Sequence, residues 1–461
     1  MSECYETKVD PSILEIINGR MAPKESEKNR FGEVFTPIRL VCEMMNRLPK
    51  SVWKDKDNKW LDPACGVGNF PIMIYYKLMN TLKTVIKTPS IRSKHIIEKM
   101  LFMNELNPDN VETCRKIFKI IDSSAKPNLF ENDFLKTSEI GGHTTFDIII
   151  GNPPYNKSRE SETSDTALYP EFIYKSVNMS AKYLTFIVPS RWFTGGKNLD
   201  SFREFMLGRI DIEYIHNIPD SRTIWPTVDI KGGVNYFLIN KTHNGPTDFN
   251  GESIELNKYD ILVQNPRAYS IIEKVQKYQE RMSDLYLATS YYGITTNSEH
   301  LTDNAKFIKC YVSQKKGAVK YVNKSHIHSD YNFWKIFTPQ GSGVGGDGFG
   351  NLIVGTPAEI ASQTFFTFKV ESKKEAESLR LFLKTKFANF MLSLRKTDQH
   401  INRETLAWIP LPPLNRKWND INIMDYYKLT QTEKRMILGS NTRKARPIKT
   451  NTKKTCTRKN V

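Results

Sequence analysis

A short run of β-branched residues constrains most strongly how this chain can fold. Ile148, Ile149 and Ile150 are apolar in succession, and Gly151 ends the run. Such a run is typical of a strand that is buried on both faces in a parallel sheet. In open α/β sheets the ligand crevice lies at the carboxyl ends of these strands. The residues that follow Gly151 are therefore predicted to border a ligand site.

The segment after this run, Asn152-Pro153-Pro154-Tyr155, is rich in hydrogen-bond acceptors. Two successive prolines lack backbone N–H groups and fix φ, which leaves carbonyl oxygens in set directions. Asn152 adds an amide oxygen, and Tyr155 adds an aromatic ring with a polar end. Acceptors beside a stacking ring suit a planar group with an exocyclic amino group, such as the edge of a base. Asn, Pro and Gly are also common turn residues, so a simple strand-to-loop turn is an equal alternative for this segment alone.

Three earlier strands are each predicted to end at an acidic residue. Asp62 follows Trp60 and Leu61, Glu105 ends the segment LFMNEL, and Asp133 follows the segment NLFEN. A carboxylate at the end of the second strand is the usual partner of ribose hydroxyls. One such acid alone is more often a helix cap or a solvated side chain. Three acids at one sheet edge instead favour a shared ligand crevice.

A glycine-containing turn follows the first of these acids. Gly66 and Gly68 lie between the strand and a helix that begins near Asn69. Glycine lets a ligand approach the main chain, although such a turn is weak evidence by itself. The spacing differs from the dinucleotide fingerprint, and Asp62 would repel a pyrophosphate. An ammonium or sulfonium group would instead be attracted to Asp62.

The segment Phe31 to Pro37, FGEVFTP, leads into a predicted helix. It precedes apolar residues at helical spacing, namely Leu40, Val41, Met44, Met45 and Leu48. We predict that Thr36 caps this helix and that Pro37 is its first residue.

The charge of the chain indicates a polyanionic partner. Lys and Arg number 67 against 50 Asp and Glu, which gives a formal net charge of +17. An excess of this kind favours nucleic acid or a membrane surface as partner. No segment approaches the length of a transmembrane helix, so nucleic acid is the better hypothesis. Eight of the basic residues lie in the acid-free tail at 441–461, which weakens charge as evidence for a binding groove.

The termini and cysteines favour a cytoplasmic protein. The first ten residues, MSECYETKVD, lack the apolar core of a signal peptide. The six cysteines are scattered without a CxxC pair, which argues against a zinc site. His326 and His328 have no third ligand at a suitable spacing, so no metal site is expected.

Together these segments resemble a known enzyme family. The order FGEVFTP, LDPACGVGNF, NEL, NDF and GNPPY is similar to the N6-adenine DNA methyltransferases of restriction-modification systems, with the gamma-type motif order. The later segments VPSRWFTGGKNLDSFREFM, IWPTVDIKGGVNYFL, WIPLPPL and YYKLTQTEK resemble one branch of that family, so the resemblance covers nearly the whole chain. Asn-Pro-Pro-Tyr alone also occurs in enzymes that methylate RNA or protein glutamine, which usually carry a shorter glycine motif.

The resemblance implies S-adenosylmethionine as cofactor and a flipped-out adenine of double-stranded DNA as substrate. Asn152, Pro153, Pro154 and Tyr155 would form the catalytic motif. The adenine would stack between Tyr155 and Trp225, where the family usually has Phe. The implied cofactor contacts are Thr36 and Asp62 at the methionine end, Ala64, Gly66 and Gly68 in the turn, Glu105 at the ribose hydroxyls, Asp133 at the adenine amino group, and Asn152.

The implied fold is a Rossmann-like S-adenosylmethionine-dependent methyltransferase sheet followed by a mixed α+β target-recognition domain. We predict a lead-in over 1–30, the catalytic domain over 31–243, the recognition domain over 244–424, and a helix with a basic tail over 425–461. In the recognition domain, a segment with helical spacing carries basic side chains, and two alternatives stay open for them, a DNA face or a merely solvated helix face; these are Lys384, Lys386, Arg395 and Lys396.

Two other functions compete with a plain modification enzyme encoded by a bacterium, phage or plasmid. One is a bifunctional enzyme that also cuts DNA; the thirty residues before the cofactor motif leave no room for a nuclease domain, so cleavage would need a separate restriction endonuclease subunit. The other is a noncatalytic DNA-binding relative. The intact Asn-Pro-Pro-Tyr segment argues against it, because a binding protein has no use for that acceptor array.

Overall fold

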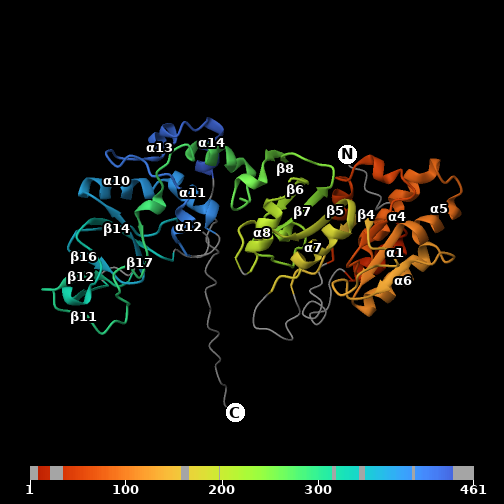
Figure 1. Ribbon diagram of the computed structural model, residues 1–461, viewed down its shortest axis with the longest axis horizontal. Coiled ribbons are helices and arrows are strands. Elements are labelled where there is room, and N and C mark those ends of the chain that lie inside the picture. The colour runs from red at the N-terminus through yellow and green to blue at the C-terminus, as the bar shows by residue number, and fades with distance from the viewer. Residues whose placement is uncertain are drawn as a thin grey trace, which may run out of the picture. The chain divides into compact units, whose positions relative to one another are not determined.

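The chain forms two compact units, Met1–Pro266 and Arg267–Val461. The computed structural model describes residues 9–20, 35–156, 166–196, 198–313, 318–341, 348–396 and 400–439. Figure 1 colours the first unit from red to green and the second from green to blue. The domain bounds given above, which are functional, stay a prediction.

One nine-stranded sheet forms the centre of the first unit, in the order β3-β2-β1-β4-β5-β7-β6-β8-β9. Its strands are β1 (Trp60–Asp62), β2 (Leu101–Glu105), β3 (Asn128–Glu131), β4 (Phe146–Gly151), β5 (Ser180–Pro189), β6 (Ile212–Ile218), β7 (Val234–Asn240), β8 (Thr247–Phe249) and β9 (Glu252–Ile254). Strands β3, β2, β1, β4 and β5 run parallel, and β7 is antiparallel to both β5 and β6. The strand order reverses between β1 and β4, which is where a doubly wound sheet opens its crevice. The predicted Rossmann-like α/β class is confirmed.

Helices pack on this sheet because each has an apolar face. They are α1 (Pro11–Arg20), α3 (Ile38–Met45), α4 (Asn69–Thr81), α5 (Pro89–His95), α6 (Pro108–Ile121), α7 (Tyr169–Met179) and α8 (Asp200–Leu207). α6 packs against β2 and β3, α4 against β2, and α7 against β5. Each of these three helices begins after the carboxyl end of a strand or crosses back over the sheet, which leaves the strand ends open for a site.

The central strand is buried as its sequence predicts. Ile148, Ile149 and Ile150 are each 0% exposed, and β4 lies between β1 and β5. Register pairs Trp60 with Ile148 and Leu61 with Ile149. Asp62, the last residue of β1, therefore lies near the end of β4. This register brings two predicted site segments together.

Two local predictions are wrong. Thr36 does not cap the helix: α3 begins at Ile38, Pro37 is its extended N-cap with φ −59° and ψ 142°, and no side chain caps it. The Thr36 hydroxyl is instead buried, so local capping preference yields to tertiary packing. The sheet continues past β7, because β8 pairs with β6 and β9 pairs with β8.

The second unit holds two four-stranded sheets, β10-β17-β14-β15 and β11-β13-β12-β16. Their strands are β10 (Tyr286–Leu287), β11 (Leu301–Thr302), β12 (Ile308–Tyr311), β13 (Val319–Val322), β14 (Trp334–Pro339), β15 (Ile353–Gly355), β16 (Glu359–Ala361) and β17 (Phe365–Val370). Its helices are α9 (Tyr269–Val275), α10 (Lys373–Leu383), α11 (Lys386–Arg395), α12 (Arg403–Leu406), α13 (Asp420–Tyr426) and α14 (Gln431–Gly439). Buried residues of both sheets, such as Cys310 and Phe337, share one apolar cluster. The predicted mixed α+β class is confirmed for this unit.

Within the part of the chain that the structure describes, no helix is both long enough and apolar enough to cross a bilayer.

Candidate active site

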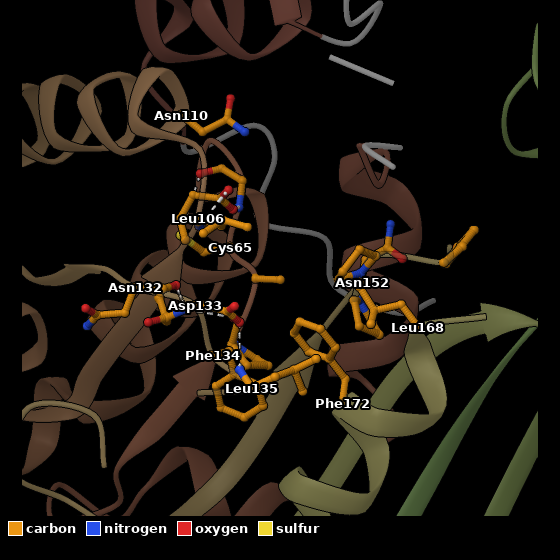
Figure 2. A pocket seen from close by; sticks show the side chains of 18 of the residues that line it. Cys65, Leu106, Asn110, Asn132, Asp133, Phe134, Leu135, Asn152, Leu168 and Phe172 are labelled. Atoms are coloured by element: carbon orange, nitrogen blue, oxygen red, sulfur yellow. Dashed lines mark hydrogen bonds between the residues drawn. The ribbon is translucent and has the colours of Figure 1, made fainter. Parts of the chain in front are cut away.

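A pocket of about 540 Å³ opens at the carboxyl ends of β1 to β4. Its lining comes from the turn after β1, the end of β2, the segment after β3, the Asn152–Asn156 segment after β4, and the start of α7. Figure 2 shows Cys65 and Asp133 on one side of it, and Asn152 and Leu168 on the other. This volume lies within the usual range of small-molecule sites.

Most of the predicted site residues meet at this pocket. The lining includes Thr36, Ala64, Gly66, Glu105, Asp133, Asn152, Pro153, Pro154 and Tyr155. Asp62, Gly68 and Trp225 are not lining residues, although each is adjacent in sequence or in contact with one that is. The structure thus assembles residues from five separate segments of the sequence at one place.

The Glu105 carboxylate is held in a fixed orientation by backbone donors. Its Oε2 accepts the N–H of Gly66 at 2.8 Å. Its Oε1 accepts the N–H groups of Leu106 at 3.0 Å and Asn107 at 2.7 Å. The carboxylate therefore joins the glycine turn after β1 to the end of β2, and it lines the pocket between them.

Asp62 is buried beneath the pocket with an incomplete set of hydrogen bonds. Its Oδ1 accepts the N–H of Ala64 at 3.2 Å, whereas Oδ2 has no hydrogen-bond partner among the described residues. Burial raises the pKa of Asp62 well above its usual range, and the nearby Glu105 charge raises it further. A Cβ on Gly151 would lie 2.6 Å from Asp62 Oδ1, so only glycine lets this carboxylate lie against the end of β4.

Asp133 lies at the pocket edge with aromatic rings beside it. Its Oδ1 accepts the N–H of Leu135 at 3.1 Å, and Lys136 Nζ is 3.1 Å from its Oδ2. The rings of Phe134 and Phe172 stack with centroids 5.2 Å apart. The pocket therefore offers a carboxylate next to a flat apolar wall, which suits an aromatic ring that carries an amino group.

Asn104 was missed by the sequence analysis, and it connects three strand ends. Its side-chain N–H group donates to the Pro63 carbonyl at 3.2 Å and to the Asn132 carbonyl at 3.0 Å. The backbone carbonyl of Asn104 accepts the N–H of Cys65 at 2.9 Å. Asn104 is 1% exposed and lines the pocket. Asp62, Glu105 and Asp133 are the sequence neighbours of Pro63, Asn104 and Asn132. The hydrogen bonds of the Asn104 amide therefore fix the positions of all three acidic segments relative to one another.

The Asn-Pro-Pro-Tyr segment forms the opposite wall. The Tyr155 ring is buried, and its hydroxyl has no hydrogen-bond partner among the described residues. The Tyr155 carbonyl accepts the N–H of Leu168 at 2.9 Å, and Asn156 forms a β-bridge with Ala167. Backbone contacts to Leu168 and Ala167 therefore fix the end of the segment, while the Asn152 side chain lies at the pocket (Figure 2).

The Phe35–Thr36 segment completes the pocket next to the glycine turn. The Trp225 indole N–H donates to the Phe35 carbonyl at 2.7 Å. The Asn69 side-chain N–H donates to the Thr36 carbonyl at 2.9 Å, and Thr36 Oγ1 is buried without a partner among the described residues. Trp225 thus contacts a lining residue without lining the pocket itself.

The Cys65 thiol lines the pocket but is not set up as a nucleophile. The pKa of Cys65 is raised well above its usual range. The main cause is a hydrogen bond with the Cys114 thiol, and the second cause is burial. Among the described residues, no group of three or more His, Cys, Asp or Glu side chains could hold a metal ion.

Comparison with known proteins identifies the part of the chain that builds this site. Residues 49–225 match the family model of the Eco57I restriction-modification methylase. These residues carry the turn after β1, the acidic strand ends and the Asn-Pro-Pro-Tyr segment. Over these residues the chain is similar to the Eco57I restriction-modification methylase family.

Individual relatives of this chain are distant. An uncharacterized adenine-specific methylase of Mycoplasma pneumoniae is 26% identical over 308 residues, which cover 49% of this chain and 72% of the relative. The type II methyltransferase M.VspI of Vibrio sp. strain 343 is 29% identical over 143 residues, or 31% of this chain and 30% of the relative.

A solved modification subunit of a putative type I restriction enzyme from Vibrio vulnificus YJ016 is 18% identical, with a TM-score of 0.40. The match covers 53% of this chain and 51% of that one. The chain thus spans about half the length of that solved structure. The family match bears out the predicted resemblance to methyltransferases of restriction-modification systems for residues 49–225.

The chemistry of the pocket fits S-adenosylmethionine. A cationic group would supply the missing partner of the buried Asp62 carboxylate, and Thr36 Oγ1 is a second buried polar atom with unmet capacity. A Cβ on Gly66 would lie 2.9 Å from the Phe35 ring, so the turn has no room for a side chain. Acids at the ends of three strands disfavour a phosphate ligand.

Basic residues predicted for a DNA face are partly occupied within the second unit. Lys386 Nζ donates to the Leu438 carbonyl, and Arg395 Nε donates to the Glu404 carbonyl while the guanidinium lies 4.6 Å from the Trp408 ring centre. Lys384 is exposed. Residues 31–34 of FGEVFTP and the basic tail at 441–461 lie outside the described residues.

Proposed function

We propose that this chain is a site-specific, adenine-specific DNA methyltransferase. It would transfer a methyl group from S-adenosylmethionine to N6 of an adenine in duplex DNA, as the modification component of a restriction-modification system. The observation that carries the proposal is that Asn152–Tyr155 and the acidic strand ends Glu105 and Asp133 line one pocket. The adenine-specific methylase of Mycoplasma pneumoniae supports the choice of base.

The strand-end wall would hold the cofactor. Asp62 and Thr36 would take the methionine end, since both have buried oxygen atoms without partners among the described residues. Glu105 is oriented by three backbone donors and would accept hydrogen bonds from the ribose hydroxyls. Asp133, beside the stacked Phe134 ring, would accept a hydrogen bond from the amino group of the cofactor's adenine. Ala64, Gly66 and Gly68 would supply main chain without bulky side chains.

The opposite wall would activate the target base. S-adenosylmethionine, when bound, supplies a methyl group that is already activated for transfer. The Asn152 side-chain oxygen and the Pro153 carbonyl would accept the two hydrogens of the target amino group, which frees its lone pair from the ring. Pro154 fixes the turn, and Tyr155 would stack on the base. Catalysis then rests on position and on fixed acceptors, without a covalent enzyme intermediate.

Duplex DNA does not present N6 to such a pocket, so the adenine would be flipped out at a cost of roughly a few kcal/mol. Trp225 is proposed as a second aromatic near the flipped base. The second unit, with its mixed α+β fold, would be the target-recognition domain. Its basic side chains would bind phosphates and make affinity depend on salt. A separate restriction endonuclease subunit and a cytoplasmic location belong to the same proposal.

The test is incubation with labelled S-adenosylmethionine and separate pools of unmethylated duplex DNA, RNA and protein. Nucleoside analysis of the labelled pool should give N6-methyladenine from DNA. Label confined to RNA or protein would keep the methyltransferase class and overturn the proposed substrate.

Asn152→Ala sharpens this test and should give the largest effect of any substitution. We expect turnover to fall at least about a thousandfold, because an acceptor used in the transition state is removed. DNA binding, measured by electrophoretic mobility shift, should stay within about twofold. Comparable turnover in the variant would remove Asn152 from the mechanism, and lost DNA binding would show a structural defect.

A further inference from the structure

Three contacts hold the Phe35–Thr36 segment, which borders the pocket without belonging to a helix or strand. The Trp225 indole N–H donates to the Phe35 carbonyl at 2.7 Å. The Asn69 side chain donates to the Thr36 carbonyl at 2.9 Å. The Phe35 ring lies so close to Gly66 that a Cβ there would be 2.9 Å from it. The position of this wall therefore depends on contacts from other parts of the chain.

Trp225 is itself fixed by the loop that follows β6. Its backbone N–H donates to the Ser221 carbonyl at 2.8 Å, and its carbonyl accepts the N–H of Val228 at 3.0 Å. The Ser221 hydroxyl donates to the Val228 carbonyl at 2.9 Å and accepts the N–H of Ile230 at 2.8 Å. The loop is closed on itself around a buried serine, and the indole is only 5% exposed. Trp225 can therefore act as a rigid support.

We propose that Trp225 is a positioning residue whose indole N–H holds the Phe35–Thr36 wall and thereby sets the affinity for the cofactor. Loss of this donor would leave the buried Phe35 carbonyl without its partner and free the wall to move. An aromatic wall for the target base needs only a ring face, whereas this role needs the N–H group. The two roles therefore predict different results for the same substitution. The inference rests on the proposed function only where it names S-adenosylmethionine as the ligand.

The first experiment measures the wall directly and needs no ligand. Trp225→Phe keeps an aromatic ring and removes the donor. Trp192→Phe is the matched control, since Trp192 is fully buried, its indole N–H has no partner among the described residues, and it does not line the pocket. Hydrogen–deuterium exchange of the segment 35–41 should be at least about fivefold faster in Trp225→Phe, and unchanged in Trp192→Phe.

The second experiment separates binding from turnover. Isothermal titration with S-adenosylmethionine should show Kd raised about five- to tenfold in Trp225→Phe, which is the loss of one hydrogen bond. The rise in Kd should exceed any fall in turnover at saturating cofactor, because Phe keeps the aromatic ring and loses only the donor. Reduced turnover with unchanged Kd and unchanged exchange would overturn the positioning role and favour a base-stacking wall.

A third variant guards against misfolding of Trp225→Phe. Replacement of Trp225 by benzothienylalanine keeps the shape of the indole and substitutes sulfur for the N–H group. It should reproduce the faster exchange with an unchanged circular dichroism spectrum; normal exchange would overturn the proposal. Should the wild-type chain fail to bind S-adenosylmethionine, the proposed function fails, and the exchange rates still decide the role of Trp225.

Discussion

The two units bury charged side chains in opposite ways. In the first unit, Asp62 accepts one N–H from Ala64, and its other oxygen has no partner among the described residues. In the second unit, the 0%-exposed Lys335 donates to the carbonyls of Tyr331 at 2.6 Å and Glu359 at 2.8 Å. Burial shifts both pKa values toward the neutral form, up for Asp62 and down to about 8 for Lys335.

This difference separates a binding role from a structural one. An unsatisfied buried carboxylate costs stability, so its presence beside a pocket indicates a ligand that supplies the partner. A buried lysine whose donors meet carbonyls stabilises the local fold instead. Substitutions at the two positions should therefore change different measurements.

Asp62→Asn tests the binding side and should have the larger effect of the two substitutions in this comparison. We expect S-adenosylmethionine affinity to fall about a hundredfold, since a charged hydrogen-bond partner contributes roughly 1.5–3 kcal/mol. The ligand-free variant should melt no lower than the wild type, because an unpaired buried charge is removed. Titration calorimetry and thermal unfolding check the two halves. Wild-type affinity in this variant would contradict a binding role for Asp62.

Lys335→Met tests the structural side. Two partly buried carbonyls lose their donor, so the free energy of unfolding should fall by about 2 kcal/mol. Urea denaturation of the full chain measures this, with exposed Lys384→Met as the control expected to change it by less than about 0.5 kcal/mol. Cofactor affinity should be unchanged in both variants. Weaker cofactor binding in Lys335→Met would contradict a purely structural role.

The pH dependence of binding should show the titration of Asp62. Its pKa is raised in the ligand-free protein, and a cationic ligand binds the ionised form, so affinity should fall as pH falls below that raised pKa. The slope approaches about tenfold per pH unit. The stability of the ligand-free protein depends on pH in the opposite direction. It falls as pH rises from the usual carboxyl pKa toward the raised pKa. Asp62→Asn should abolish both trends, and a persistent slope in that variant would assign them to another group.

Tyr155→Phe should have the smallest effect. The hydroxyl is buried without a partner among the described residues, so its removal should leave turnover within about twofold and stability equal or slightly higher. Tyr155→Ala is the contrasting variant, because it removes the ring and should lower turnover much further. A loss above about tenfold in Tyr155→Phe would give the hydroxyl a chemical role.

Local patterns were sufficient to predict the strands and their acidic ends. Apolar runs identified β1, β2 and β4, and the residues after them had to share one edge of a parallel sheet. The role of Asn104 could not be predicted, because its partners Pro63 and Asn132 lie 41 and 28 residues away. Burial of Lys335 was equally inaccessible. Its two carbonyl partners come from the loop before β14 and from a strand in the neighbouring sheet.

Prediction also failed where a local rule met a tertiary one. Threonine before proline is a common helix cap, yet Thr36 is buried and its carbonyl is bound by Asn69. Trp225 was taken from the resemblance as an aromatic wall, and its hydrogen bond to Phe35 has no signature in the sequence.

The bond between Trp225 and Phe35 joins residues 190 positions apart. A chain leaves the ribosome from its N-terminus, so all three acidic strand ends emerge well before Trp225 does. Closing so large a loop is slow and gains nothing until the β6 and β7 strands have paired. The Phe35–Thr36 wall of the pocket therefore gains its Trp225 hydrogen bond only when most of the first unit has been synthesised.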